Sequence, residues 1–300
     1  IGNFIGTDSS GGVALGNSAS GIALLSGAGS AVDFVSKTPN LIGKPGLGNV
    51  ISSNNYGVFI ADNNTSKNWI QSNSIGTNVG GNSDLGNTLD GILVGGGTLD
   101  NRIGGTGAGE GNLIAFNRRG IFADGGNGNS FRRNRLFSND ELGIDLAPVG
   151  VTPNDPGDGD TGPNGLLNYP VITYVNAQNS FVRIEGTFSS SPNQNYTIEF
   201  FGNTAIDPTG SGEGRNFLGQ TVVTTDGSGN ANFNVEFSAN ISNTGAWVTA
   251  TATDSSNNTS EFSQGRNICS LIRLTPAGLL SSAGGGSSSF TVEQSVGCGG

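Results

Sequence analysis

Short blocks built on asparagine, an apolar residue and a Gly-Ile or Gly-Val step recur through the first half of the chain. The steps begin at Gly21, Gly57, Gly91, Gly120 and Gly143. The spellings IGT, LGN and GI at residues 5–22 return in the same order at residues 75–92. Repeats of about 20–50 residues are typical of solenoids, in which one repeat buries its apolar face only by stacking on the next. The pattern therefore predicts stacked coils.

The most compact copy is NSFRRNRLFSNDELGIDL, residues 129–146. We interpret it as one coil of a right-handed parallel β-helix, with five coils in residues 1–150. Inward apolar side chains of successive coils would stack at about 4.8 Å per coil. Asparagine suits the corners because it tolerates left-handed backbone and its amide can bond to the asparagine of the next coil. Glycine suits corners where a side chain would clash.

The blocks NLIG…NVISSNNYGVFI, NWIQSNSIG…GILV and NRIGG…NLIAFNRRGIF resemble the parallel β-helix repeats of bacterial secreted and surface proteins with the pectate-lyase-like fold. The resemblance covers about the first 150 residues. It is specific for a fold and not for an activity. It implies an extracellular protein, either secreted or displayed on the cell surface.

Residues 151–170 are rich in Pro, Gly and Asp and predict a connecting loop. Residues 171–265 then contain seven short alternating runs, which predict an antiparallel β-sandwich. The runs are Val171–Val175, Phe181–Phe188, Tyr196–Phe201, Phe217–Thr224, Ala231–Phe237, Trp247–Thr253 and Ser260–Ser263. In Trp247–Thr253, we expect Val248, Ala250 and Ala252 to face the core and the threonines to face water.

The stretches TIEFFGN, DPTGSGEG and TATATDSSNNTSEFS resemble an immunoglobulin-like module that often follows such β-helices in large bacterial extracellular proteins. In that family a cysteine often precedes the Asp-Pro pair, whereas this chain has Ile206, so a disulfide at that position is lost. Residues 266–300 resemble the opening strands of a further bacterial β-sandwich, which is incomplete here. The expected fold class is all-β, with further domains of the same chain as neighbours.

Charge and composition narrow the partners. The chain has 13 Lys and Arg against 23 Asp and Glu, and the net charge of −10 disfavours nucleic acid, whose phosphates require basic surface. No apolar run reaches the roughly 18 residues that span a bilayer, so we expect no membrane insertion of this piece. Met is absent and the first block starts within the pattern, so we expect a piece of a longer protein. Cys269 and Cys298 could pair in an oxidising compartment.

Catalysis receives little support from the residue types. The chain has no His, which excludes Ser-His-Asp and Cys-His arrangements. Enzymes of the resembled fold usually use carboxylates with Arg or Lys, often with calcium. The positions expected on an exposed face of successive coils are mostly apolar: Ala23, Phe59, Leu93, Phe122 and Asp145. A lyase or hydrolase groove needs converging acid and base groups, so we expect no catalytic groove on this face. Turnover of a polysaccharide that Asp145→Ala abolishes would contradict this expectation.

Two groups of charged residues are candidate binding sites. Asp155, Asp158 and Asp160 gather the hard oxygen ligands that calcium requires, without the spacing of an EF-hand; a solvated acidic loop is the alternative. Five arginines lie within residues 118–135: Arg118, Arg119, Arg132, Arg133 and Arg135. They could form a basic strip for a sulfated or uronic-acid glycan. Alternatively, they pair with nearby acids in a solvated face: Asp124, Asp140 and Glu141.

These features predict a non-catalytic extracellular or cell-surface module with a structural and adhesive role, presenting its stacked turns to a polysaccharide or cell-surface glycan. Repeated side chains at a fixed interval match a polymer of repeating units, so several shallow contacts could act together. The alternative is a fragment of a polysaccharide lyase or glycoside hydrolase.

Overall fold

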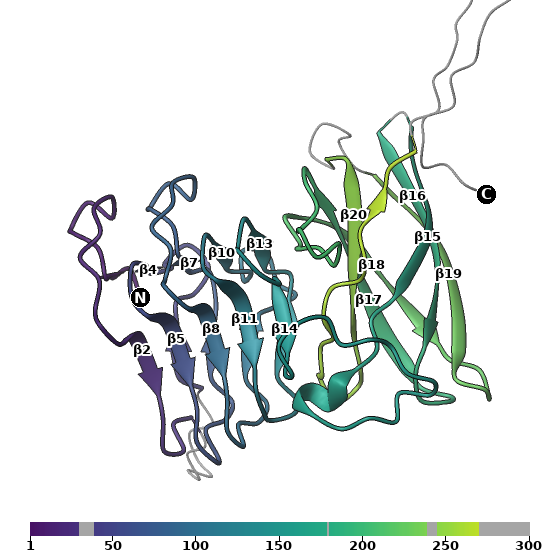
Figure 1. Cartoon of the computed structure of the whole chain (residues 1–300), viewed down its shortest axis with the longest axis horizontal. Coiled ribbons are helices and arrows are strands. Elements are labelled where there is room, and N and C mark those ends of the chain that lie inside the picture. The colour runs from purple at the N-terminus through teal and green to yellow at the C-terminus, as the bar shows by residue number, and fades with distance from the viewer. Residues whose placement is uncertain (30–38, 179, 239–244, 270–300) are drawn as a thin grey trace, which may run out of the picture.

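A computed structural model of the chain describes residues 1–29, 39–178, 180–238 and 245–269. These residues form β-strands and one short 3-10 turn, η1 (Pro163–Leu166). Figure 1 shows two regions side by side along the long axis. We call Phe4–Leu146 the parallel region and Val171–Asn267 the antiparallel region. The predicted all-β class is confirmed.

The parallel region contains three sheets of parallel strands, in which each strand pairs with the strand three places later in the chain. The first sheet contains β1 (Phe4–Ile5), β4 (Val50–Ile51), β7 (Ser74–Ile75), β10 (Leu113–Ala115) and β13 (Arg135–Phe137). The second contains β2 (Ser20–Leu24), β5 (Tyr56–Ile60), β8 (Asp90–Val94), β11 (Arg119–Ala123) and β14 (Ile144–Leu146). The third contains β3 (Leu41–Ile42), β6 (Trp69–Ile70), β9 (Arg102–Gly104) and β12 (Ser130–Arg132). The chain therefore visits the three sheets in turn, and equivalent strands of successive repeats stack as predicted.

The Gly-(Ile/Val) steps set the register of the second sheet. The residues after the glycines lie opposite one another along the sheet: Ile22, Val58, Ile92, Ile121 and Ile144. They point into one hydrophobic core with the inward residues of the other two sheets, including Ile75 and Ile103, which are fully buried. Stacked apolar rows therefore hold the parallel region together, because no repeat has a core of its own.

Glycine is required where one repeat approaches the next. Gly76 has φ +82, and a Cβ built there would lie 2.1 Å from the carbonyl oxygen of Ala115 in the following repeat. A side chain would meet both a left-handed backbone and a steric clash. The predicted role of glycine at the corners is therefore confirmed.

The antiparallel region has two sheets around a second core. One contains β15 (Val171–Gln178), β16 (Phe181–Ser189) and β19 (Asn230–Ser238). The other contains β18 (Asn216–Thr224), β17 (Asn195–Asn203), β20 (Trp247–Thr253) and β21 (Arg266–Asn267). Six of the seven predicted runs are strands, and their inward residues, such as Ile184, Ile198 and Phe200, are fully buried.

The prediction of a seventh strand at Ser260–Ser263 is wrong. This segment follows β20, but the N–H groups of Ala250 and Ala252 donate to the side-chain oxygens of Ser263 and Ser260, each at 2.9 Å. Hydroxyls thus take bonds that a strand would make with carbonyls, so no regular ladder forms. The short strand β21 begins three residues later.

Two expectations about exposure are also wrong. The threonines of β20 are as buried as its core residues; Thr249 is 0% exposed and donates to the carbonyl oxygen of Glu213 at 2.6 Å. The outer row of the second parallel sheet aligns as predicted, and its first member, Ala23, is exposed as expected, but Phe122 and Asp145 are only 9% and 1% exposed. The Arg119 guanidinium covers the Phe122 ring at 3.6 Å and so contributes to the burial of Phe122.

The ends of the described chain bear on three further predictions. Cys269 is buried and disulfide-bonded, and Cys298 lies outside the described residues. The predicted further module covers residues 266–300, of which only 266–269 are described. Among the described residues, no helix is long and apolar enough to cross a membrane.

Candidate functional site

Three ladders of asparagine run along the parallel region, one at each corner between sheets. In each ladder, the Nδ2 group of one asparagine donates to the Oδ1 of the asparagine in the next repeat at 2.8–3.3 Å. The first contains Asn3, Asn49, Asn73, Asn112 and Asn134. The second contains Asn17, Asn54, Asn87, Asn117 and Asn139. The third contains Asn40, Asn68, Asn101 and Asn129. The predicted stacking of corner asparagines is confirmed.

All three ladders have the same polarity, which leaves donors unpaired at the last repeat unless another segment supplies acceptors. Asn139 donates from both its backbone N and its Nδ2 to Glu213 Oε1, at 3.2 and 2.6 Å. The backbone N of Asn129 donates to Asn164 Oδ1 at 3.1 Å. Residues beyond the repeats therefore end two ladders, and Glu213 comes from the antiparallel region.

The antiparallel region also accepts from the last strand of each parallel sheet. Leu136 of β13 donates its N–H to Gly214 O at 2.9 Å. Phe131 of β12 donates to Thr259 Oγ1 at 3.1 Å, and Leu146 of β14 donates to Glu261 Oε1 at 2.9 Å. An open sheet edge is a template for unwanted pairing, so these bonds protect the end of the stack.

Apolar contacts complete this junction, which we define as the contact surface between the two regions. Phe201 and Phe262 belong to the antiparallel region by sequence, yet both are 2% exposed and pack in the core of the parallel region. Their rings meet edge to face, with centroids 5.4 Å apart. The antiparallel region therefore closes the apolar end of the stack, a role that solenoids assign to a capping unit.

Two acids at the junction, the partly buried Glu213 and the buried Glu261, have strongly perturbed ionisation. Burial raises the pKa of Glu213 to about 7, against the smaller lowering by its bonds from Asn139. Burial likewise raises the pKa of Glu261 to about 7, although its oxygens accept the N–H groups of Leu146 and Thr152. Both groups are therefore partly protonated near neutral pH.

Three of the five arginines, Arg119, Arg132 and Arg135, lie on strands of three different sheets, and Arg118 and Arg133 lie in bends beside strands. Arg119 is buried and pairs with Asp90 at 2.7 Å and Asp145 at 3.6 Å. Arg118, which is exposed, pairs with Glu141 at 2.8 Å. Of the three acids expected as partners, Glu141 alone pairs with these arginines in the described residues.

The other arginines point to the junction or to solvent. Arg132 pairs with Glu199 at 2.9 Å, and Arg133 approaches the same carboxylate at 3.5 Å, so both serve the junction. Arg135 is exposed and lies over the Phe137 ring at 5.1 Å. Glycan binding by the exposed Arg118 and Arg135 stays a prediction.

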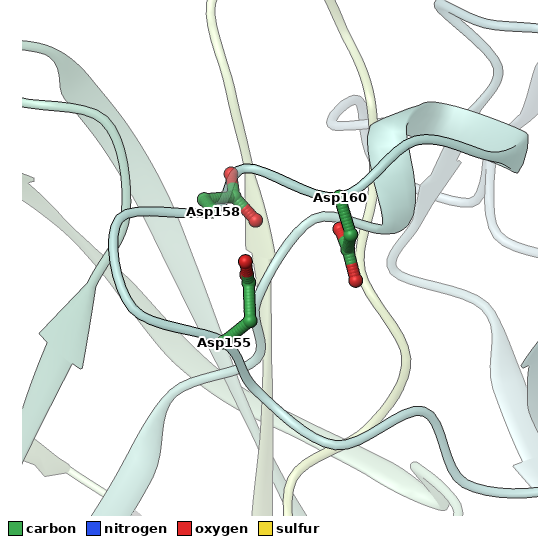
Figure 2. Close-up of side chains that lie close together, drawn as sticks. All are labelled: Asp155, Asp158 and Asp160. Atoms are coloured by element: carbon green, nitrogen blue, oxygen red, sulfur yellow. The ribbon is translucent and has the colours of Figure 1, made fainter.

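The three loop aspartates do come together. Each of Asp155, Asp158 and Asp160 offers a carboxylate oxygen within 4.8 Å of the others, and Figure 2 shows the three side chains gathered around one space. Oxygens bound to one Ca²⁺ at 2.3–2.6 Å can lie up to about 5 Å apart, so the spacing fits. The cluster sits on the segment that connects the two regions.

Hydrogen bonds hold part of the cluster and leave part of it open. Asp158 accepts from Asn168 N at 2.9 Å and from the Ser190 hydroxyl at 2.6 Å. In contrast, Asp155 Oδ1 and Asp160 Oδ1 are buried and have no hydrogen-bond partner. Burial, and then the neighbouring carboxylates, raise the pKa of Asp158 and of Asp160. Carboxylate oxygens without hydrogen-bond partners, close to other carboxylates, fit a divalent cation. A bound cation would supply a partner for these oxygens and reduce the repulsion among the carboxylates.

No pattern in the sequence indicated Glu199, Glu213 or Glu261. Glu213 lies 74 positions from Asn139, and it follows no periodic pattern that could mark it. The only available signal is the rule that a ladder of donors must end on an acceptor, which does not say where that acceptor lies in the chain. No family model matches the chain, and no curated protein matches it.

Proposed function

We propose that the chain is a non-catalytic structural and adhesive module of an extracellular or cell-surface protein. In this proposal the parallel region is a right-handed parallel β-helix of the pectate-lyase-like kind, and the antiparallel region is an immunoglobulin-like sandwich. The carrying observation is the junction, where Phe201, Phe262 and Glu213 close the end of the stack. A joint built from shared core and buried hydrogen bonds suits a rigid rod that spaces other modules.

The burial of Asp145 supports a non-catalytic role. It is the one acid in the outer row of the second parallel sheet, and it is 1% exposed. Its carboxylate is held by Arg119 and by the N–H of Gly150. A polysaccharide lyase or hydrolase needs acid and base groups that reach the substrate, and this side chain offers almost no surface to one.

Calcium is the second part of the proposal. Asp155, Asp158 and Asp160 would hold the ion, and their segment links β14 to β15. A bound cation would relieve the repulsion among the three carboxylates and fix the connecting segment against the antiparallel region, where Asp158 already bonds to Ser190. Calcium would thereby stiffen the joint.

A distance measurement tests the rigid joint. Spin labels on cysteines introduced at Ser83 and Asn232, exposed positions in the two regions, report the distance between them. A rigid joint gives one narrow distance distribution. The double variant Glu213→Ala and Phe262→Ala should broaden it. A broad distribution in the otherwise unchanged protein would show that the regions move independently and would refute the spacer role.

A further inference from the structure

A cavity of about 280 Å³ lies beside the junction, between the connecting segment and the edge strands β15 and β21. Its lining includes Asn154, Tyr169, Pro170, Ile172, Gln264 and Arg266. The volume is near the lower end, about 300 Å³, of pockets that bind small molecules. The cavity therefore suits a single sugar unit and not a wide stretch of polymer.

The polar groups of this cavity are available to a ligand. Within the described residues, the side chains of Tyr169, Gln264 and Arg266 form no hydrogen bond and no ion pair. Tyr169 and Arg266 are partly buried, and Gln264 is exposed. An arginine without a partner in a partly buried pocket is unusual on a chain with net charge −10, where acids are abundant.

The pocket is also held in shape. Asn154 Oδ1 accepts the backbone N–H of Tyr169 at 2.9 Å, and Asn154 Nδ2 donates to the backbone oxygen of Tyr169 at 2.8 Å. These two bonds fix the tyrosine against the connecting segment. A preorganised site loses less entropy when a ligand binds.

We propose that this pocket binds one uronate unit of an acidic polysaccharide. The inference rests on the adhesive part of the proposed function and gives it a site. The planar guanidinium of Arg266 matches a carboxylate with two parallel hydrogen bonds. Tyr169 supplies an aromatic face with a polar tip, and Gln264 supplies both a donor and an acceptor for hydroxyl groups.

The charges around the pocket agree with an anionic ligand. Arg266 is the one charged residue in its lining. The nearby Glu261 contributes to the raised pKa of Tyr169, after burial, but both Glu261 oxygens already accept backbone N–H groups. A carboxylate entering the pocket would therefore meet one uncompensated cation.

Calorimetry with tetragalacturonate and with its carboxyl-reduced, neutral counterpart tests the proposal on the full chain. We expect the charged oligomer to bind at least tenfold more tightly than the neutral one. Arg266→Gln should weaken binding of the charged oligomer at least tenfold, and Tyr169→Phe should weaken it less. Arg183→Gln, on β16 and outside the lining of the pocket, is the matched control and should change nothing. Arg118→Gln tests the alternative glycan site in the parallel region. Because the Arg266 side chain has no partner, Arg266→Gln should leave the melting temperature unchanged.

The outcomes separate this inference from the proposed function. Equal binding of charged and neutral oligomers, or no effect of Arg266→Gln, overturns the pocket. If Arg118→Gln weakens binding of the charged oligomer and Arg266→Gln does not, the glycan site lies in the parallel region. If neither oligomer binds, the uronate proposal fails, while the rigid-joint measurement still decides the structural role.

Discussion

Glu213 Oε1 lies 2.6 Å from Asn139 Nδ2 and occupies the place that the next asparagine of the second ladder would take. It accepts hydrogen bonds from the backbone N and the Nδ2 of Asn139. Each earlier asparagine of this ladder donates from the same two atoms to the Oδ1 of its successor, as Asn117 does to Asn139. A carboxylate oxygen from the antiparallel region thus replaces an amide oxygen of the repeat. The ladder and the junction therefore form one continuous hydrogen-bonded structure.

The first prediction concerns this acceptor. Glu213→Ala leaves two donors of Asn139 without their protein acceptor at a partly buried site, which should cost about 1–3 kcal/mol in the free energy of unfolding. Glu213→Gln retains an oxygen at the same reach and should cost less. Urea titrations of the two variants measure the difference. Equal stability of Glu213→Ala and the unchanged protein would show that the ladder needs no terminal acceptor.

The second prediction is a fall in stability with rising pH. Glu213 and Glu261 titrate near 4.5 when exposed and at about 7 in the folded protein. The neighbouring acids Asp207 and Asp145 act in the same direction as burial, since each raises the pKa of its neighbour. Between about pH 4.5 and 7 the folded state binds more protons than the unfolded state, so stability decreases as pH rises through this window.

Urea midpoints measured from pH 4.5 to pH 8 test this sign. We expect the highest midpoint at the acidic end of the window. The double variant Glu213→Gln and Glu261→Gln, in which neither side chain titrates, should show a much flatter profile. A midpoint that increases steadily over the same range would contradict the assignment of these two acids as the titrating groups.

Local patterns in the sequence predicted much of the parallel region. A Gly-(Ile/Val) step follows an asparagine by three or four residues in every repeat. Ile92 and Ile121 could therefore be aligned without coordinates, and the ladder asparagines likewise. Strand alternation located six antiparallel strands for the same reason. The alternation of apolar and polar residues wrongly predicted a strand at Ser260–Ser263, where the acceptors are serine hydroxyls. Alternation does not distinguish a hydroxyl acceptor from a backbone carbonyl acceptor.

The site was predictable only where its residues are close in the chain. Asp155, Asp158 and Asp160 share one loop, so their meeting follows from proximity. Tyr169 and Arg266 line one pocket from distant positions, and nothing in their local sequence indicates it. The burial of the threonines in β20 also depends on a long-range event, the docking of the two regions.

The third prediction is that calcium raises stability through the loop aspartates. A ligand that binds only the folded state stabilises it in proportion to RT ln(1 + [L]/Kd), about 2.7 kcal/mol at one hundred times Kd. We expect the melting temperature to increase between chelator and millimolar calcium. Asp160→Asn should reduce this increase. Asp254→Asn, in a turn outside the cluster, is the control and should keep it. A melting temperature that is the same in chelator and in millimolar calcium would show that the three aspartates bind no calcium.

The fourth prediction separates backbone strain from steric clash at two glycines. Gly76 and Gly46 have φ values of +82 and +77, but a Cβ at Gly46 would meet no atom within 4 Å. Gly46→Ala should therefore lower the free energy of unfolding only by the strain of a left-handed alanine backbone, about 1–2 kcal/mol. Gly76→Ala should cost more, because its Cβ would collide with the Ala115 oxygen. Urea denaturation of both variants checks the order, and equal losses would contradict close stacking of the repeats.

The last prediction concerns the coupling of the two regions through Phe262. This side chain is 2% exposed and lies in the core of the parallel region, although its backbone belongs to the antiparallel region. Truncation to alanine removes buried apolar surface and leaves a cavity, which typically costs about 3–5 kcal/mol for a phenylalanine. Because the cavity lies between the regions, the loss of stability should weaken their coupling.

Thermal unfolding followed separately in each region measures that coupling. In the unchanged protein, we expect Trp69 of the parallel region and Trp247 of the antiparallel region to report one common transition. In Phe262→Ala, the two signals should separate, with the parallel region unfolding first because its apolar end is then open. Val222→Ala, at a side chain 60% exposed on β18, is the control and should change stability by about 0.5 kcal/mol or less. Coincident transitions in Phe262→Ala would mean that the hydrogen bonds of Glu213 and Glu261 couple the regions without the aromatic contact.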